Sequence, residues 1–165
     1  MKKLLPALLL FITLSLSAQT EKQRVEVSAV LDSWHKAAAE ANFEAYFSKL
    51  STDAVFIGTD PTEHWTKDAF IAFAKPFFEK GKAWDFKALE RHIYFSEDGK
   101  IAWFDELLDT WMKVCRGSGV LKKEDGQWKI AHYVLSITIP NDNTDEVIQL
   151  KANFDDKILE KLKSK

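Results

Sequence analysis

The 165-residue sequence carries 23 Lys and Arg residues against 25 Asp and Glu residues, a formal net charge of −2 at pH 7. Its basic residues form no stripe, so neither nucleic acid nor an acidic membrane surface is expected as a partner. The single cysteine, Cys115, cannot close a disulfide within the chain, so packing of the six Trp and twelve Phe side chains has to hold the fold together.

The first residues have the layout of a secretory signal peptide. Two lysines follow the first methionine, residues 4–16 are almost wholly apolar, and mostly small residues lead up to Ala18. The apolar run is too short to span a bilayer comfortably. We therefore expect residues 1–18 to be removed, leaving a single domain over residues 19–165 in the periplasm or outside the cell.

The first half of the chain is expected to be helical apart from one strand, because its apolar residues recur mainly at helical spacing. Asn42 and Thr66 each stand where a helix N-cap is needed. Pro76 should kink the helix that contains it. The predicted elements are helices over residues 21–40 and 43–50, a strand over residues 54–57 and a helix from residue 67 to Gly81.

The second half changes to the alternating pattern of strands. Two acidic-Gly turns and a third turn near Trp111 and Met112 separate four such runs, and short connections of this kind indicate an antiparallel meander. An amphipathic helix follows, with acidic residues at its start and lysines at its end, which suits the helix dipole. The predicted strands are residues 84–96, 101–109, 114–123 and 128–139, and the predicted helix is residues 144–162.

This order of elements predicts an α+β fold. A cone-shaped, curved antiparallel sheet is covered on its concave face by the N-terminal helices, and the C-terminal helix is an addition. The open end of such a cone is a common position for a ligand site.

The second half of the chain also resembles a known family. Residues 116–121 read Arg-Gly-Ser-Gly-Val-Leu and residues 124–132 read Glu-Asp-Gly-Gln-Trp-Lys-Ile-Ala-His, with Ser136 near the end of the same strand. This pattern resembles the SnoaL-like domains of the nuclear transport factor 2-like, or ketosteroid isomerase-like, superfamily. The resemblance covers roughly residues 25–140 and implies the cone and its pocket. It implies no particular reaction, because the superfamily contains isomerases, cyclases, dehydratases, hydrolases and oligomerisation domains.

The sequence predicts a carboxylate–arginine pair across the second hairpin. If the chain turns near residues 111–112, Arg116 falls opposite residues 105–107. Side chains alternate along a strand, so only one of Asp105 and Glu106 can share its face, and the sequence leaves open which. In an apolar pocket the pair could act as a general base with a cation that holds an anionic product. On the outer face it would be an ordinary ion pair. We name Asp105 as the candidate base.

Other candidates are polar or aromatic residues at positions that could face the pocket. His132 could serve as an acid or base, although Val134 stands where many relatives carry a second histidine, so a histidine-pair mechanism is not expected. Asp60 precedes a proline, which favours a turn role for it, and Arg91 could instead face solvent. The ligand-binding candidates are Arg116, Arg91, Glu63, Asp60, Trp103, His35 and Trp34.

No cofactor is expected, since there is no glycine-rich phosphate loop. No metal site is expected either, because the four histidines lie 28 or more residues apart. The sequence therefore predicts an exported, homodimeric domain that binds a small apolar or acidic molecule. It could be a cofactor-free acid–base isomerase, cyclase or dehydratase; the alternative is a non-catalytic ligand-binding or oligomerisation module.

Overall fold

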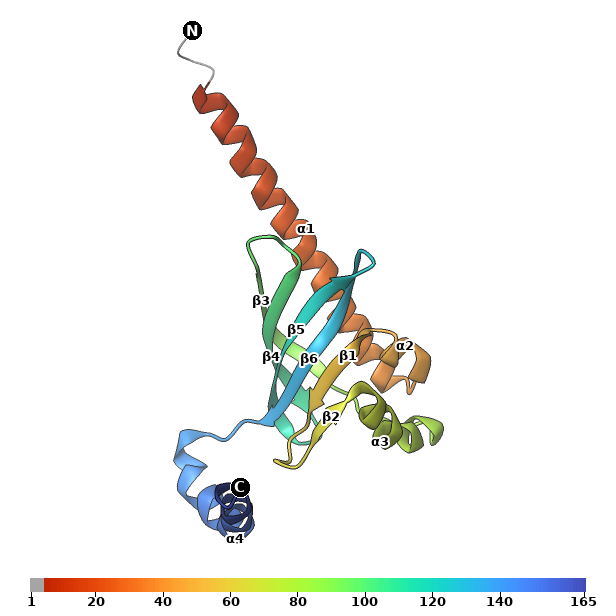
Figure 1. Ribbon diagram of the computed structural model, residues 1–165, viewed down its shortest axis with the longest axis vertical. Helices are drawn as coiled ribbons and strands as arrows, with labels where there is room; N and C mark the ends of the chain where they lie inside the picture. The colour runs from red at the N-terminus through yellow and green to blue at the C-terminus, as the bar shows by residue number, and fades with distance from the viewer. Residues whose placement is uncertain (1–4) are drawn as a thin grey trace.

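The computed structural model describes the backbone of residues 5–165 and the side chains from Thr20 onward (Figure 1). The elements in chain order are α1 (Leu5–Ala39), α2 (Phe43–Phe47), β1 (Leu50–Ile57), β2 (His64–Thr66), α3 (Lys67–Glu79), β3 (Lys87–Phe95), β4 (Ile101–Thr110), β5 (Lys113–Glu124), β6 (Gln127–Ile137), a 3-10 helix (Asn141–Asn143) and α4 (Thr144–Lys163). Of the predicted signal segment, residues 1–4 lie outside the described residues and residues 5–18 continue the backbone of α1. In the part of the chain that the structure describes, the helices contain no apolar stretch of the length that a bilayer span requires.

The six strands form one curved sheet in the order β2-β1-β6-β5-β4-β3. The predicted meander is confirmed, because β3, β4, β5 and β6 pair antiparallel in sequence order. β1 differs from the prediction, since it pairs parallel with β6 and the sheet is therefore mixed. A parallel pair needs a crossover rather than a hairpin, and here β2, α3 and the strands β3 to β5 lie between the two strands in the chain. Sequence also missed the short edge strand β2.

Local signals at the element ends are confirmed. The Asn42 side chain accepts a hydrogen bond from the Ala45 amide, and the Thr66 side chain accepts one from the Ala69 amide, so both residues cap helices as predicted. The β5–β6 turn places Asp125 and Gly126 at φ of 49° and 78°. Two successive positive φ angles are typical of the tight turn that suits the twist of a hairpin.

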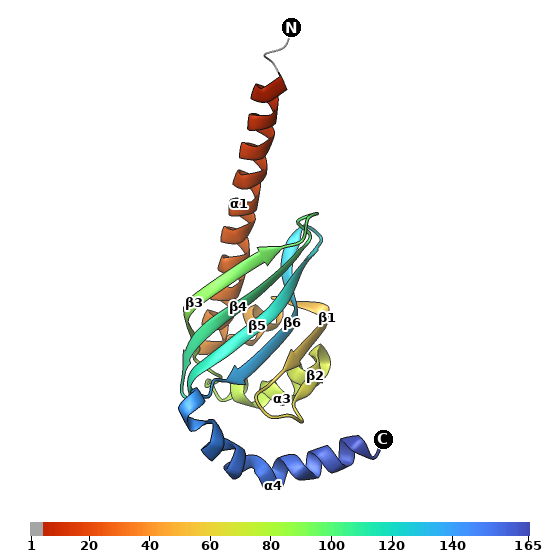
Figure 2. The ribbon, with the colours of Figure 1, turned by 90° about the vertical axis from the view of Figure 1, so that its left-hand side faces the viewer.

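The hydrophobic core lies between the concave face of the sheet and the helices α1, α2 and α3 (Figure 2). Aromatic rings fill most of it, with Trp34, Tyr46 and Phe70 all within 1% of complete burial. Along β4 the even-numbered residues are buried and the odd-numbered ones are more exposed. This alternation decides which polar side chains of the strand lie inside the cone.

Candidate functional site

The most unusual feature of the interior is a buried carboxylate that is surrounded by hydrogen-bond donors. Glu106, on the inner face of β4, is 1% exposed. Its Oε1 lies 2.7 Å from His35 Nε2 and accepts the Tyr133 hydroxyl at 3.3 Å. Its Oε2 accepts Arg91 Nε at 2.9 Å and lies 2.8 Å from Nη2 of the same guanidinium. We call these four residues the Glu106 cluster.

Four separate elements bring the cluster together. His35 comes from α1, Arg91 from β3, Glu106 from β4 and Tyr133 from β6. Arg91 and Glu106 are direct partners across the β3–β4 ladder, which fixes the ion pair by register. Gly117 is the partner of Glu106 on the other side, and a Cβ there would lie 2.3 Å from the Tyr133 hydroxyl and 3.0 Å from Glu106 Oε1. Glycine therefore provides the space in which the tyrosine reaches the carboxylate.

The charged groups of the cluster stabilise one another's ionised forms. Burial raises the pKa of Glu106, but the His35 hydrogen bond and the Arg91 charge outweigh it, so that the pKa is lowered and the carboxylate stays ionised. Burial lowers the pKa of Arg91, and Glu106 together with Asp32, 2.7 Å from Nη1, raises it overall. Burial and the neighbouring Glu106 charge raise the pKa of Tyr133 well above its usual value. The tyrosine therefore remains a donor.

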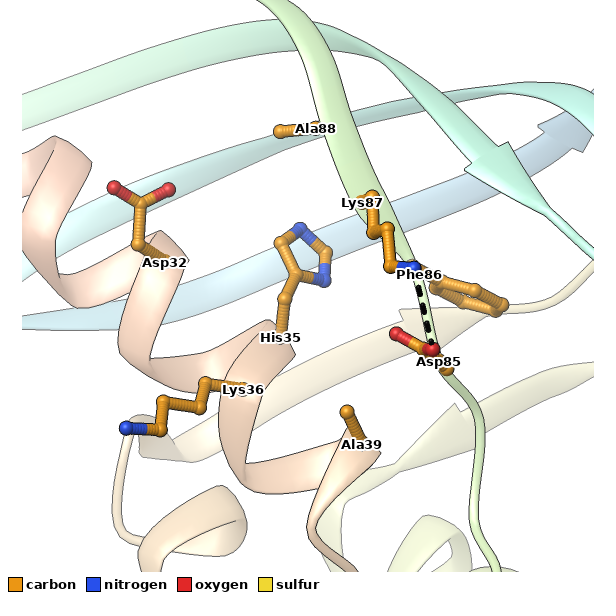
Figure 3. Close-up of a pocket in the computed structure, with 8 residues that line it drawn as sticks. All are labelled: Asp32, His35, Lys36, Ala39, Asp85, Phe86, Lys87 and Ala88. Atoms are coloured by element: carbon orange, nitrogen blue, oxygen red, sulfur yellow. Dashed lines mark ion pairs between the residues drawn. The ribbon is translucent and has the colours of Figure 1, made fainter.

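One side of the cluster borders a pocket of about 260 Å³, the His35 pocket, shown in Figure 3. The ring of His35 projects from α1 into it. One ring nitrogen points up towards the sheet and the other towards the side occupied by Phe86 and Asp85. The pocket is lined by Asp32, His35, Lys36, Ala39, Asp85, Phe86, Lys87 and Ala88.

A second cavity, the aromatic pocket of about 180 Å³, lies between α3, the β1–β2 connection and the β4–β5 turn. Phe86 lines both pockets and packs 6.4 Å from the His35 ring, centroid to centroid. The aromatic pocket is lined by Phe56, Gly58, Thr59, Glu63, Trp65, Phe70, Phe73, Trp84, Phe86, Trp111, Met112 and Leu135.

The predicted pair of Arg116 with Asp105 or Glu106 is wrong. Arg116 does fall opposite the predicted segment, since its partner is Leu107, but its side chain is exposed on the outer face. Glu106 faces inward one residue away, and strand alternation puts Asp105 on the outer face, where it lies 3.0 Å from His92. Neither Asp105 nor Arg116 lines either pocket.

Two further candidates also belong to the outer face. His132 is partly buried and is paired with Val120, in the outward row that includes Trp103, whereas Tyr133 next to it points inward. Trp103 is 45% exposed and stacks on Tyr94 at 5.9 Å. Successive side chains of a strand point to opposite faces of the sheet. These two side chains therefore point outward, although their neighbours in the chain point into the interior.

The remaining candidates divide between turn, pocket and core. Asp60 is a turn residue: its Oδ1 accepts the Thr62 amide at 2.8 Å, and the Thr62 hydroxyl helps to lower its pKa. Glu63 lines the aromatic pocket and accepts the Asp60 amide at 3.2 Å. Trp34 is 1% exposed and stacks on Tyr46, so it belongs to the core. His35 does line a pocket.

Arg91 faces the interior, so the solvent-facing alternative is wrong for it. The sequence-based candidates did not include three residues of the site, Tyr133, Asp32 and Phe86. For Tyr133 a signal was available, because it sits beside His132 in an apolar strand and one of the two has to point inward. Asp32 precedes His35 by three residues, which places both on one helix face.

The sequence of the chain matches the profile of a known protein family. The family profile described as a SnoaL-like domain matches residues 27–140. No curated protein matches the sequence.

Several solved structures share the fold. A proposed dehydratase of the NTF2-like family from Streptomyces avermitilis is 10% identical, with a TM-score of 0.65 over 73% of this chain and 99% of that one. An NTF2-like protein from Cytophaga hutchinsonii is 21% identical, with a TM-score of 0.59 over 70% and 98%. A proposed calcium/calmodulin-dependent protein kinase II association domain from Xanthomonas campestris is 21% identical, with a TM-score of 0.53 over 70% and 87%.

Proposed function

The chain belongs to the SnoaL-like domain family, and on that premise we propose that it binds a small, mostly apolar molecule on which His35 moves a proton without a cofactor. The observation that carries the proposal is the 2.7 Å contact between His35 and the buried Glu106 carboxylate at the edge of a pocket. A histidine oriented by a carboxylate is a recurrent acid–base arrangement in enzymes.

The two pockets favour a small ligand with a flat apolar part. Each is smaller than the roughly 300–1,000 Å³ of pockets that hold drug-sized molecules. Rings and Leu135 line most of the aromatic pocket, and aromatic walls suit a planar ligand. Because Phe86 borders both cavities, a ligand ring that packs against Phe86 can direct its polar group towards His35.

Within the Glu106 cluster, His35 is the group that can exchange a proton with a ligand. Both oxygens of Glu106 already accept hydrogen bonds, and its pKa is lowered, so it is a poor proton acceptor. An ionised Glu106 holds the proton on His35 Nε2, which leaves Nδ1 unprotonated in the neutral ring. The other ring nitrogen is the one directed towards Phe86 and Asp85 (Figure 3). Glu106 would then stabilise the imidazolium that forms when Nδ1 takes a proton.

The reaction class follows from what such a base can do. Removing a proton from a carbon beside a carbonyl group is a step shared by many isomerases, cyclases and dehydratases. The returned proton goes to another carbon in an isomerisation, or to a departing hydroxyl group in a dehydration. The Streptomyces avermitilis neighbour, described as a proposed dehydratase, supports this class.

The test is proton exchange on a simple probe, 2-tetralone, a bicyclic ketone with acidic protons beside its carbonyl. In heavy water, deuterium replaces these protons, and their proton NMR signals should disappear faster with the protein than in buffer alone. His35→Gln should reduce the protein-dependent rate by about 10²–10⁴-fold, the usual contribution of a general base. The matched control is His132→Gln, which changes a histidine on the outer face and should leave the rate unchanged. A rate unaffected by His35→Gln would refute the catalytic role.

A non-catalytic ligand-binding or oligomerisation module is the second candidate. The contacts of Glu106 favour this candidate, because a carboxylate that is surrounded by four donor atoms can have a purely structural role. The Xanthomonas campestris neighbour, described as a proposed association domain, favours assembly. Quenching of tryptophan fluorescence by 2-tetralone without any exchange would select this candidate.

Export and dimerisation belong to the same proposal. Residues 1–18 serve as the signal segment, and an intact mass that begins near Gln19 would support this, whereas a cytoplasmic product that retains residues 1–18 would refute it. A homodimer is supported by the apolar side chains that one copy of the chain leaves exposed; Tyr94 and Trp103, for example, are 47% and 45% exposed and stack on each other.

A further inference from the structure

α4 is an amphipathic helix that lies apart from the rest of the domain, and in Figure 2 it runs across beneath the sheet and α3 (Figures 1 and 2). None of its residues is buried, and Leu150 is 86% exposed. Its apolar side chains lie on one side of the helix, which we call the apolar stripe. The stripe consists of Val147, Ile148, Leu150, Phe154, Ile158, Leu159 and Leu162.

A helix of this length with such a stripe needs a partner. Most helical stability in proteins comes from the packing of an amphipathic face against a partner and not from intrinsic helix propensity. α4 starts with carboxylates and ends with lysines, and both groups interact favourably with the helix dipole. On an exposed helix each such interaction contributes only tenths of a kcal/mol to helix stability. The exposed stripe is therefore a surface that something covers in solution.

The distribution of charge along α4 identifies the partner. Residues 144–156 carry four carboxylates and one lysine, whereas residues 157–165 carry four lysines and one carboxylate. The segment is neutral as a whole, so it lacks the cationic excess with which a helix binds an anionic membrane surface. Two copies side by side in the same direction would set like charges against each other. Two copies in opposite directions would set acidic halves against basic halves.

We propose that α4 pairs antiparallel with α4 of a second copy of this chain, stripe against stripe. With Phe154 of both helices near the crossing point, Val147 comes level with position 161 of the partner helix, within one residue of the partner helix's Leu162. In the same register Asp145 lies near Lys163 of the partner helix. The arrangement is a closed two-fold contact, because each copy offers the same surface to the other. It is distinct from the outer face of the sheet, which carries Trp103.

The first experiment is sedimentation equilibrium of the purified protein over a wide concentration range. The protein should dimerise, and Phe154→Asp should raise the dissociation constant about tenfold or more, because it places a charge at the centre of the stripe. The matched control is Asn153→Asp, which adds the same charge on the polar side of α4 and should leave the constant within about twofold. Trp103→Asp serves as a second control and should change the constant little.

The direction of the pair is tested by cross-linking a Val147→Cys/Leu162→Cys variant under mild oxidation. The two positions are about 22 Å apart along one helix, too far for a disulfide within one chain. An antiparallel pair should give peptides that link position 147 of one chain to position 162 of the other. Links between two 147 positions would overturn the proposed direction.

Three results would overturn the proposal itself. One is a protein that stays monomeric at all concentrations. Another is a dimer that Trp103→Asp dissociates and Phe154→Asp does not, which would assign the interface to the sheet. The last is a monomer in which Phe154→Asp changes the affinity for 2-tetralone, which would assign the stripe to the mouth of the protein's own aromatic pocket.

Discussion

Replacing Arg91 by methionine removes the cation of the Glu106 cluster and keeps most of its apolar stem. The Arg91 side chain is 10% exposed and contacts Glu106 twice, at 2.9 and 2.8 Å, whereas its other acidic partner, Asp32, is 65% exposed. Removing one partner of a buried ion pair costs about 3–5 kcal/mol. The exposed contact with Asp32 adds at most about 1 kcal/mol. His35 still contacts Glu106, so we expect a loss near the lower limit, about 3 kcal/mol.

Urea unfolding followed by tryptophan fluorescence measures this loss, provided that the slope of the transition is unchanged. The matched control is Arg116→Met, the same substitution at an exposed arginine, which should change the free energy of unfolding by no more than about 0.5 kcal/mol. Equal losses in the two variants would refute the assignment of Arg91 as the cation of the cluster.

The pH dependence of the same loss has a definite sign. The pKa of Glu106 is lowered in the folded protein, so the cluster stabilises the fold above the ordinary carboxyl pKa and loses that contribution as the pH falls through the folded pKa. Arg91→Met removes part of what lowers this pKa. The difference in stability between wild type and variant should therefore be greatest near neutral pH and shrink in acid. A difference that grows in acid would contradict the ionised state of Glu106.

Two other predictions concern neighbouring contacts. Gly117→Ala places a Cβ 2.3 Å from the Tyr133 hydroxyl. The substitution should therefore destabilise the fold by about 1–3 kcal/mol, as measured by urea unfolding. An unchanged urea midpoint would show that the Glu106 cluster tolerates the added methyl group. On the outer face, the hydrogen bond that His92 donates to the Asp105 carboxylate raises the pKa of His92, so Asp105→Asn should lower the His92 pKa in an NMR titration. Because the folded pKa of His92 is raised, the stabilisation from this pair is present below its ordinary pKa and is lost as the pH rises through the folded value. An unchanged His92 pKa in Asp105→Asn would show that the pair does not form in solution.

Local sequence patterns predicted most of the fold. Asn42 and Thr66 cap their helices because a short polar side chain next to an apolar periodic run has few other roles. The turn at Trp111 and Met112 was found because apolar runs of strand length end on both sides of it. β2 was missed because three residues are too few to show any period.

The site was harder to predict because alternation along a strand tells which residues share a face and not which face is inside. On β4, Asp105 and Glu106 are adjacent and each has one apolar neighbour, Phe104 or Leu107, so hydrophobicity alone could not choose between them. The partners of Glu106 come from α1, β3 and β6, up to 71 residues away in the chain. Such contacts depend on the curvature of the sheet, which no local pattern specifies.

The most direct test of the proposed chemistry is a crystal structure of the protein with bound 2-tetralone. We expect the ring to lie against Phe86, with a carbon beside the carbonyl about 3–3.5 Å from His35 Nδ1, the separation of a reactive pair. His35 Nε2 should still contact Glu106 in the complex. A ligand bound on the outer face near Asp105 and His132, or a His35 ring turned so that Nδ1 contacts Glu106, would contradict the proposed role of His35.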